Sequence, residues 1–212
     1  KPLAPSFADA AMLLSWKQPS IVVGYCLRFA LATQELREAL PRIAPLRIVE
    51  AVYSERPLHR AAWLDDPRQG GAALEYSHIL DLLLWLFGKP VAVQAQTVGV
   101  PDRAVVAALR WPDGLLGTLR MDFLSPTETR IKVVGDRGVV EWHRDRIVGV
   151  GCDPSVEPST AWLVHEADEL DAVIKGALFL SPRLCSLMEA MAVLDLVGHL
   201  RWRSDPEALA PS

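Results

Sequence analysis

The centre of the chain alternates between apolar and polar positions with a period of two, which is typical of strands that bury one face. In the clearest case, Leu119, Met121 and Phe123 alternate with polar residues. The pattern predicts strands over residues 46–54, 91–99, 104–111, 116–124, 128–134, 138–142 and 145–150. Turns rich in Pro, Asp and Gly separate most of them. We therefore expect a mostly antiparallel sheet with one buried and one open face.

Apolar residues at helical spacing flank these strands. They predict helices over residues 6–16, 31–40, the stretch between Gly71 and Gly88, 166–178 and 183–200. We expect the second helix to end before Pro41, because proline disrupts a helix interior. The apolar strand Ile21–Tyr25 has no evident pairing partner, so it indicates a parallel sheet upstream of the chain. Residues 152–160 read as a loop, and the tail after Arg203 is expected to be disordered.

Composition and charge exclude several classes of protein. Half of the 212 residues are apolar and the net charge is −4, which argues against binding to nucleic acid or to an anionic membrane surface. The apolar runs are too short to span a bilayer. Cys26, Cys152 and Cys185 lack the CxxC spacing. We therefore expect a cytoplasmic protein in a reducing compartment.

The helix that follows Gly70 and Gly71 carries Glu75, His78 and Asp81 among apolar residues. The spacing places Glu75 and His78 on one helix face. A histidine on an apolar helix is, by itself, more often a hydrogen-bonded core residue than a catalyst. A carboxylate one turn before it can hold the imidazole in one tautomer, which suits a general acid/base. Asp81 is equally well explained as a structural partner.

Tyr25 and Arg28 follow the first predicted strand, at the end where α/β sheets bind ligands. Arg28 is expected either to bind a carboxylate or hydroxyls of a ligand or to form a surface salt bridge, and spacing does not decide between them. Trp63 lies in the charged loop 55–69, whose length indicates a functional or mobile segment. We take Tyr25, Arg28, Trp63 and Asp81 as candidate substrate-binding residues.

Other chemistries lack their sequence signals. The histidines have none of the spacings that zinc sites use, so no metal site is predicted. The chain contains neither a GxSxG nucleophile elbow nor a GxGxxG dinucleotide loop. The stretch from Gly135 to Gly138 reads as a hairpin turn and not as a phosphate loop, because no helix follows it.

Several of these motifs together resemble the Gfo/Idh/MocA family of NAD(P)-dependent oxidoreductases. Lys1-Pro2 match the end of the family's Glu-Lys-Pro motif, and Val23-Gly24-Tyr25 with Arg28-Phe29 match the strand and Arg-Phe signature after it. The helix from Gly70 through His78 to Asp81 is similar to the family's helix of Gly-Gly, acidic residue, His and Asp. Residues 131–141 resemble its I-x-G-x-x-G-x-x-E hairpin.

The resemblance implies an α+β fold, with a mostly antiparallel open sheet flanked by helices and preceded by a remnant of a Rossmann domain. Residues 1–28 are expected to be this remnant, 29–203 the substrate-binding and oligomerisation domain, and 204–212 a tail. The implied reaction transfers a hydride between NAD or NADP and a secondary alcohol of a sugar, cyclitol or similar polyol. Lys1, His78 and Glu75 would be catalytic, and Lys1 with Pro2 would contact the cofactor.

The resemblance also implies a homo-oligomer that pairs through the sheet face. The chain departs from the family pattern in that its acidic residue is Glu, three residues before the histidine, and in that the glycine-rich loop is absent. We therefore expect a truncated member, inactive as the 212-residue chain alone. The alternative is a non-catalytic sugar-binding or dimerisation module left from such an enzyme.

Overall fold

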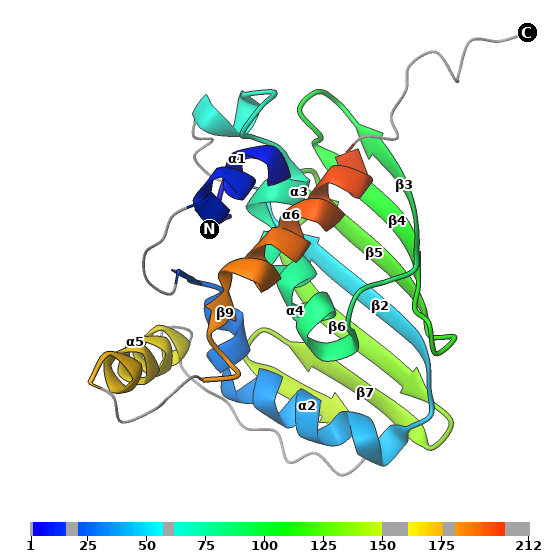
Figure 1. Cartoon of the computed structure of the whole chain (residues 1–212). Helices are drawn as coiled ribbons and strands as arrows, with labels where there is room; N and C mark the ends of the chain where they lie inside the picture. The colour runs from blue at the N-terminus through cyan, green and yellow to red at the C-terminus, as the bar shows by residue number, and fades with distance from the viewer. Residues whose placement is uncertain (1, 16–20, 57–61, 150–160, 176–180, 202–212) are drawn as a thin grey trace, which may run out of the picture.

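The computed structural model describes residues 2–15, 21–56, 62–149, 161–175 and 181–201. Within them, one seven-stranded sheet has the order β3-β4-β5-β2-β6-β7-β8 (Figure 1). Its strands are β2 (Leu46–Ser54), β3 (Ala92–Val98), β4 (Ala104–Arg110), β5 (Leu116–Asp122), β6 (Glu128–Gly135), β7 (Gly138–His143) and β8 (Arg146–Gly149). Only β2 and β5 run parallel; the other neighbours are antiparallel.

Four of the described helices lie against one face of this sheet, and the opposite face is uncovered in Figure 1. They are α2 (Leu31–Ile43), α3 (Ala72–Glu75), α4 (Ser77–Phe87) and α6 (Leu187–Arg201). Helix α1 (Phe7–Ala11) packs against α6, and α5 (Ala161–Ile174) packs against residues Cys26–Phe29. Every second residue of β2, namely Val49, Ala51 and Tyr53, is buried under the helices. Short 3₁₀ helices cover Met12–Ser15, Cys26–Phe29 and Ala62–Asp65. The predicted α+β class and mostly antiparallel open sheet are confirmed.

The alternation predicted for residues 116–124 holds in the structure except at Asp122, which is 3 % exposed because its carboxylate accepts hydrogen bonds from the Leu124 and Ser125 N–H groups. Leu119, Met121 and Phe123 are at most 4 % exposed on the helix-covered face. Thr118 and Arg120 lie on the open face. The Gly135–Gly138 hairpin turn joins β6 to β7 as expected. The strand bounds therefore follow from the alternation of residue types.

The predicted lack of a partner for the strand Ile21–Tyr25 is wrong. The observed strand β1 (Val22–Val23) pairs antiparallel with β9 (Cys185–Ser186), which leads into α6. A two-residue strand needs only one short extended partner, and the sequence gives no sign of it. Whether residues 1–28 are the remnant of a separate domain stays a prediction.

The second helix continues beyond its predicted end at Pro41. It runs to Ile43, so Pro41 lies in its last turn. Leu40 and Ile43 are 7 % and 1 % exposed and anchor this turn in the core. The hydrogen bond that Pro41 cannot donate is outweighed by this apolar burial.

No helix in the described ranges is long and apolar enough to cross a membrane.

Candidate active site

The two glycines before α3 allow other parts of the chain to pack directly on their backbone. A Cβ atom on Gly70 would overlap the Leu64 carbonyl, and one on Gly71 would overlap the Asp102 carboxylate. Gly71 also has φ of 101°, a conformation that favours glycine. Gly70 and Gly71 therefore permit the close approach of the Leu64 carbonyl and the Asp102 carboxylate.

Asp102, in the turn between β3 and β4, caps the first turn of α3. Its Oδ2 accepts a hydrogen bond from the Ala73 N–H at 2.8 Å, and its carbonyl accepts one from the Ala72 N–H at 2.7 Å. Its Oδ1 lies 2.9 Å from Nε of Arg201 at the end of α6. Burial raises the pKa of Asp102, and the Ala73 N–H and Arg201 oppose this rise. The start of α3 is thereby fixed between the sheet and α6.

The prediction of a single helix after Gly71 is wrong, because a break at Tyr76 divides this segment into two helices. This residue has φ −93° and ψ 24° and separates α3 from α4. Its ring stacks on Tyr53 with centroids 4.4 Å apart, and its hydroxyl donates a hydrogen bond to the Glu55 carbonyl at 2.8 Å. This attachment to the end of β2 holds Tyr76 out of helical geometry. Glu75 and His78 therefore belong to different helices.

His78 lies in the first turn of α4 and is 8 % exposed. The Tyr25 ring meets the imidazole edge-on, with centroids 5.5 Å apart and planes at 81°. Burial raises the pKa of Tyr25, and the neighbouring Ser77 hydroxyl partly offsets that rise. The structure thus brings together two of the predicted site residues, Tyr25 and His78, in a buried position.

Arg28 and Asp81 form a bidentate ion pair one helical turn beyond His78. Nε of Arg28 lies 2.9 Å from Oδ2 of Asp81, and Nη2 lies 2.6 Å from Oδ1. Both side chains are 1 % exposed. Burial raises the pKa of Asp81, and the hydrogen bonds from Arg28 oppose the rise. The two roles considered for Arg28, ligand binding and a surface salt bridge, both place its guanidinium where solvent reaches it. The structure instead buries this side chain, because Asp81 compensates its charge.

A third group, Glu189, extends this ion pair to α6. Its Oε1 accepts a hydrogen bond from Nη1 of Arg28 at 2.9 Å, and its Oε2 accepts one from the Ser186 N–H at 2.9 Å. The Ser186 hydroxyl in turn accepts a hydrogen bond from the Glu189 N–H at 3.3 Å. This reciprocal arrangement is a capping box. Arg28 therefore ties the 3₁₀ helix Cys26–Phe29 to both α4 and α6.

The remaining predicted residues are dispersed. Trp63 is 44 % exposed in the 3₁₀ helix Ala62–Asp65. Glu75 is half-buried at the end of α3, and Pro2 is half-buried near the chain start. Lys1 lies outside the described residues. Their assigned contacts with substrate or cofactor stay predictions.

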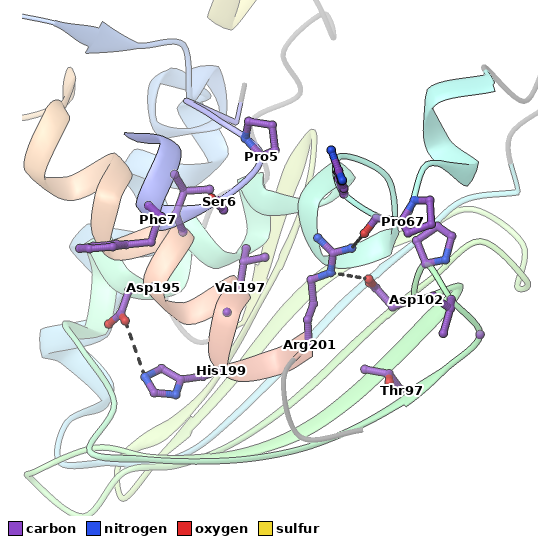
Figure 2. A pocket seen from close by; sticks show the side chains of 17 residues that line it. Pro5, Ser6, Phe7, Pro67, Thr97, Asp102, Asp195, Val197, His199 and Arg201 are labelled. Carbon is purple, nitrogen blue, oxygen red and sulfur yellow. Dashed lines mark hydrogen bonds and ion pairs between the residues drawn. The ribbon is translucent and has the colours of Figure 1, made fainter. Parts of the chain in front are cut away.

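A cavity of about 760 Å³ lies between the start of α1, the β3–β4 turn and the second half of α6 (Figure 2). Figure 2 shows the Arg201 guanidinium reaching from α6 to Asp102 and to the Pro67 carbonyl along one wall. A second cavity, of about 400 Å³, lies beside the start of β3 and is lined by Lys89, Asp195 and His199 among others. His78 lines neither of these two cavities.

The glycine turns at Gly71 and Gly135 do not offer a cradle for a dinucleotide. The Asp102 carboxylate occupies the space beside Gly71, and the Ile43 carbonyl occupies the space beside Gly135. A pyrophosphate needs free N–H groups and room at such positions. These two turns therefore do not fit the pyrophosphate of a nicotinamide dinucleotide. The described residues also contain no group of three or more His, Cys, Asp or Glu residues placed to hold a metal ion.

Sequence reasoning missed three residues that position this region: Asp102, Glu189 and Arg201. The Ser186-x-x-Glu189 pattern is a recognisable capping box, so α6 could have been started there. From the sequence, Asp102 could be recognised only as a turn residue. Its partners in α3 and α6 are distant in sequence, and no local pattern points to them.

Comparisons with solved structures show the same fold in dehydrogenases. The WlbA dehydrogenase from Bordetella pertussis, solved with NADH and UDP-GlcNAcA, is 22 % identical with a TM-score of 0.75, over 100 % of this chain and 71 % of that one. The aldose-aldose oxidoreductase from Caulobacter crescentus, complexed with glycerol, is 19 % identical with a TM-score of 0.79, over 98 % and 69 %. An inositol dehydrogenase homologue from Azotobacter vinelandii, complexed with NAD+, is 16 % identical with a TM-score of 0.78, over 97 % and 69 %.

No curated protein matches the chain. The family model of the GFO/IDH/MocA C-terminal domain matches residues 34–141. The match contains β2, the Gly70–Gly71 turn, α3, α4 and the strands through most of β7. It covers just over half of the 212 residues. The chain therefore belongs to the GFO/IDH/MocA family and carries its C-terminal domain.

Proposed function

We propose that this chain is the substrate-binding part of an NAD(P)-dependent oxidoreductase. The reaction would transfer a hydride between the nicotinamide and a secondary alcohol carbon of a sugar, cyclitol or similar polyol. Family membership supports the proposal, as do the NADH, NAD+, glycerol and sugar-nucleotide complexes of proteins with this fold. The observation that carries it is the placement of His78 against Tyr25 at the start of α4, which the Asp102 cap and the Arg28–Asp81 pair fix from two sides.

In this proposal His78 handles the proton of the reacting hydroxyl. When a secondary alcohol is oxidised, its carbon loses a hydride and its oxygen loses a proton as the carbonyl forms. An imidazole beside that oxygen accepts the proton, and it returns the proton in the reverse reaction. Lys1 would polarise the same oxygen or relay the proton, and Glu75 would orient the imidazole or the substrate.

The cofactor in this proposal is NAD or NADP, with Lys1 and Pro2 as contacts from this chain. Because the chain's own atoms fill the space beside Gly71 and Gly135, the proposal requires further dinucleotide-binding residues. The cofactor supplies or receives the hydride when it is bound. The chain's own residues position the polyol and its proton.

A screen of neutral polyols and nucleotide-linked sugars tests this function. The protein is assayed with NAD+ and with NADP+, both as this chain and extended by its upstream coding sequence, and nicotinamide absorbance is followed. We expect reduction of the nicotinamide by at least one polyol with the extended protein. The absence of turnover with every polyol and both cofactors would contradict the proposal.

The burial of His78 favours a second candidate, a non-catalytic sugar-binding or dimerisation module. The ring is 8 % exposed and lines neither of the two cavities described above. A module of this kind would bind a polyol without turnover. Replacement of His78 would then leave polyol affinity unchanged, whereas the oxidoreductase proposal predicts a loss of turnover.

We also propose that two copies of the chain pair through the open face of the sheet. Ile48, Leu116 and Val148 on this face are 42 %, 54 % and 52 % exposed. Arg130 on the same face lies within 4 Å of carboxylate oxygens of Glu50 and Glu141. Apolar residues beside charges of both signs make a surface that is complementary to a second copy of itself.

A further inference from the structure

The Tyr25 side chain connects the segment before the 3₁₀ helix Cys26–Phe29 to the beginning of α4. Its ring lies against the His78 imidazole, and its hydroxyl is directed to the hydroxyl of Ser77, where α4 begins. Tyr25 is 1 % exposed and Ser77 is fully buried. Within the described residues, neither hydroxyl has another hydrogen-bond partner. Because buried hydroxyl groups are almost always satisfied, each of these two depends on the other.

A second contact joins the same two segments three residues further along each of them. Arg28 follows Tyr25 by three residues, and Asp81 follows His78 by three. Arg28 and Asp81 form the bidentate ion pair described above. Residues three apart in a helix lie on one face, so both contacts reach the same face of α4. One contact leaves a helix free to turn about its axis, whereas two contacts along one face fix that rotation. Tyr25 supplies the contact at the imidazole.

The burial of Tyr25 indicates a role behind the imidazole rather than a direct contact with substrate. His78 is 8 % exposed, so the imidazole has more accessible surface than the tyrosine ring. A substrate hydroxyl that bound to the Tyr25 oxygen would have to displace Ser77. Burial also raises the pKa of the Tyr25 hydroxyl, which therefore carries no charge at neutral pH.

We propose that Tyr25 is a positioning residue for His78. Its ring fixes the orientation of the imidazole, and the contact between its hydroxyl and Ser77 holds the ring in place. The inference rests on the proton-handling role of His78 proposed above. It gives Tyr25 a role other than the substrate contact expected from the sequence. A positioning residue changes kcat, whereas a substrate contact changes the affinity for substrate.

Steady-state kinetics and calorimetry separate these two roles, with the polyol found in the screen and the form of the protein that turns it over. We expect Tyr25→Phe and Ser77→Ala each to lower kcat about threefold to tenfold, because a displaced catalytic group reacts more slowly. Kd for the polyol should stay within about twofold, since neither hydroxyl contacts it. The double variant should lose no more than either single variant, because both changes break the same contact.

Tyr25→Leu removes the ring as well and should lower kcat about 100-fold. The matched control is Phe87→Leu. Phe87 forms a similar edge-on pair with Trp111 at the other end of α4, with centroids 6.0 Å apart and planes at 68°. This control should keep kcat within about twofold, because the two sites are distant from each other. Tyr25→Phe and Ser77→Ala keep every buried ring, so the test does not depend on the folding of Tyr25→Leu.

NMR measures the placement of the imidazole without any turnover. The His78 ring protons are assigned by their loss in His78→Gln. We expect a nuclear Overhauser cross-peak between the Tyr25 and His78 rings in the wild-type chain, because the two rings are in contact. Ser77→Ala leaves both rings in the chain, so a weaker cross-peak in this variant shows that the hydroxyl contact holds the Tyr25 ring in place.

The outcomes separate this inference from the proposed function. If Tyr25→Phe raises Kd for the polyol and leaves kcat unchanged, Tyr25 contacts the substrate and the positioning role is wrong. Additive losses in the double variant, or an unchanged cross-peak in Ser77→Ala, would show that the hydroxyl contact does not hold the ring. In each of these cases the proposed function stands. If the wild-type protein turns over no polyol, the proposed function is wrong and this inference falls with it.

Discussion

Arg28 and Asp81, 53 residues apart in sequence, meet in the core with both guanidinium–carboxylate contacts at 2.9 Å or less. Their geometry is bidentate, and Arg28 adds a third hydrogen bond to Glu189. The three residues connect the 3₁₀ helix Cys26–Phe29, α4 and α6. Because α4 begins with Ser77 and His78, this pair sets where the imidazole lies.

Removing one partner of this pair should destabilise the protein strongly. Arg28→Met or Asp81→Leu leaves one buried charge uncompensated, which costs about 3–5 kcal/mol. The double variant Arg28→Met/Asp81→Leu should lose less than the sum of the two, since neither charge remains. Urea denaturation measures all three free energies of unfolding. As a control, Arg47→Met breaks the exposed Arg47–Asp136 pair and should leave stability unchanged. Additive losses in the double variant would show that the pair does not act as a unit.

Gly71→Ala should destabilise the protein more than Gly114→Ala, although both replacements impose a similar backbone strain. Gly71 and Gly114 both have positive φ, 101° and 89°. An added Cβ meets the Asp102 carboxylate at Gly71 and nothing within 4 Å at Gly114. We expect Gly114→Ala to cost about 1–2 kcal/mol from strain, and Gly71→Ala to cost clearly more. Thermal or urea unfolding of both variants gives the comparison. Equal losses would mean that the close approach of Asp102 is unimportant.

Acid should weaken the attachment of α6 through Glu189. Burial acts to raise the pKa of this carboxyl, but hydrogen bonds from Ser186 and the charge of Arg28 outweigh it and hold the pKa below its usual value. Such a group stabilises the fold above its unfolded-state pKa of about 4.3. That contribution is lost as the pH falls through the lower folded-state pKa.

Urea denaturation of wild-type protein and Glu189→Gln between pH 3 and pH 7, roughly one unit below and several above the usual glutamate pKa, measures this effect. The stability difference between them should be largest near neutrality and should shrink in acid. A difference that is constant over this range would show that ionisation of Glu189 is irrelevant.

Pairing through the open sheet face predicts that charge on this face produces monomers. Ile48 and Leu116 are direct neighbours across β2 and β5. Ile48→Glu/Leu116→Glu places four like charges at the interface of two copies. Sedimentation at micromolar concentration should show a wild-type dimer and a variant monomer. Val164→Glu, at an equally exposed site on α5, should remain dimeric. A wild-type monomer would contradict the pairing.

The sheet could be predicted from sequence because its signals are local. Strand β2 has the predicted bounds 46–54, and the alternation of Leu119, Met121 and Phe123 marks the buried face. Prediction failed where distant contacts decide the local structure. Tyr76 leaves the helix because it stacks on Tyr53, and α2 passes Pro41 because Ile43 is buried.

Part of the candidate site could also be predicted, because some of its residues have local sequence signals. The Gly-Gly turn and His78 have local signals, and Tyr25 was found from its position after a strand. Arg28 and Asp81 were named, but their pairing was not foreseen, because a 53-residue separation leaves no trace in a periodic pattern. Asp102 acts from another element of the fold, so only the three-dimensional arrangement brings it to this site.

The proton-handling role of His78 is tested most directly by steady-state turnover of the polyol found in the screen, with wild-type protein and His78→Gln compared across pH. If His78 handles the proton, kcat falls about 100-fold or more, dinucleotide affinity is unchanged, and the ionisation near neutral pH that an imidazole gives is lost. A His78→Gln variant with wild-type kcat and the wild-type pH profile would contradict this role.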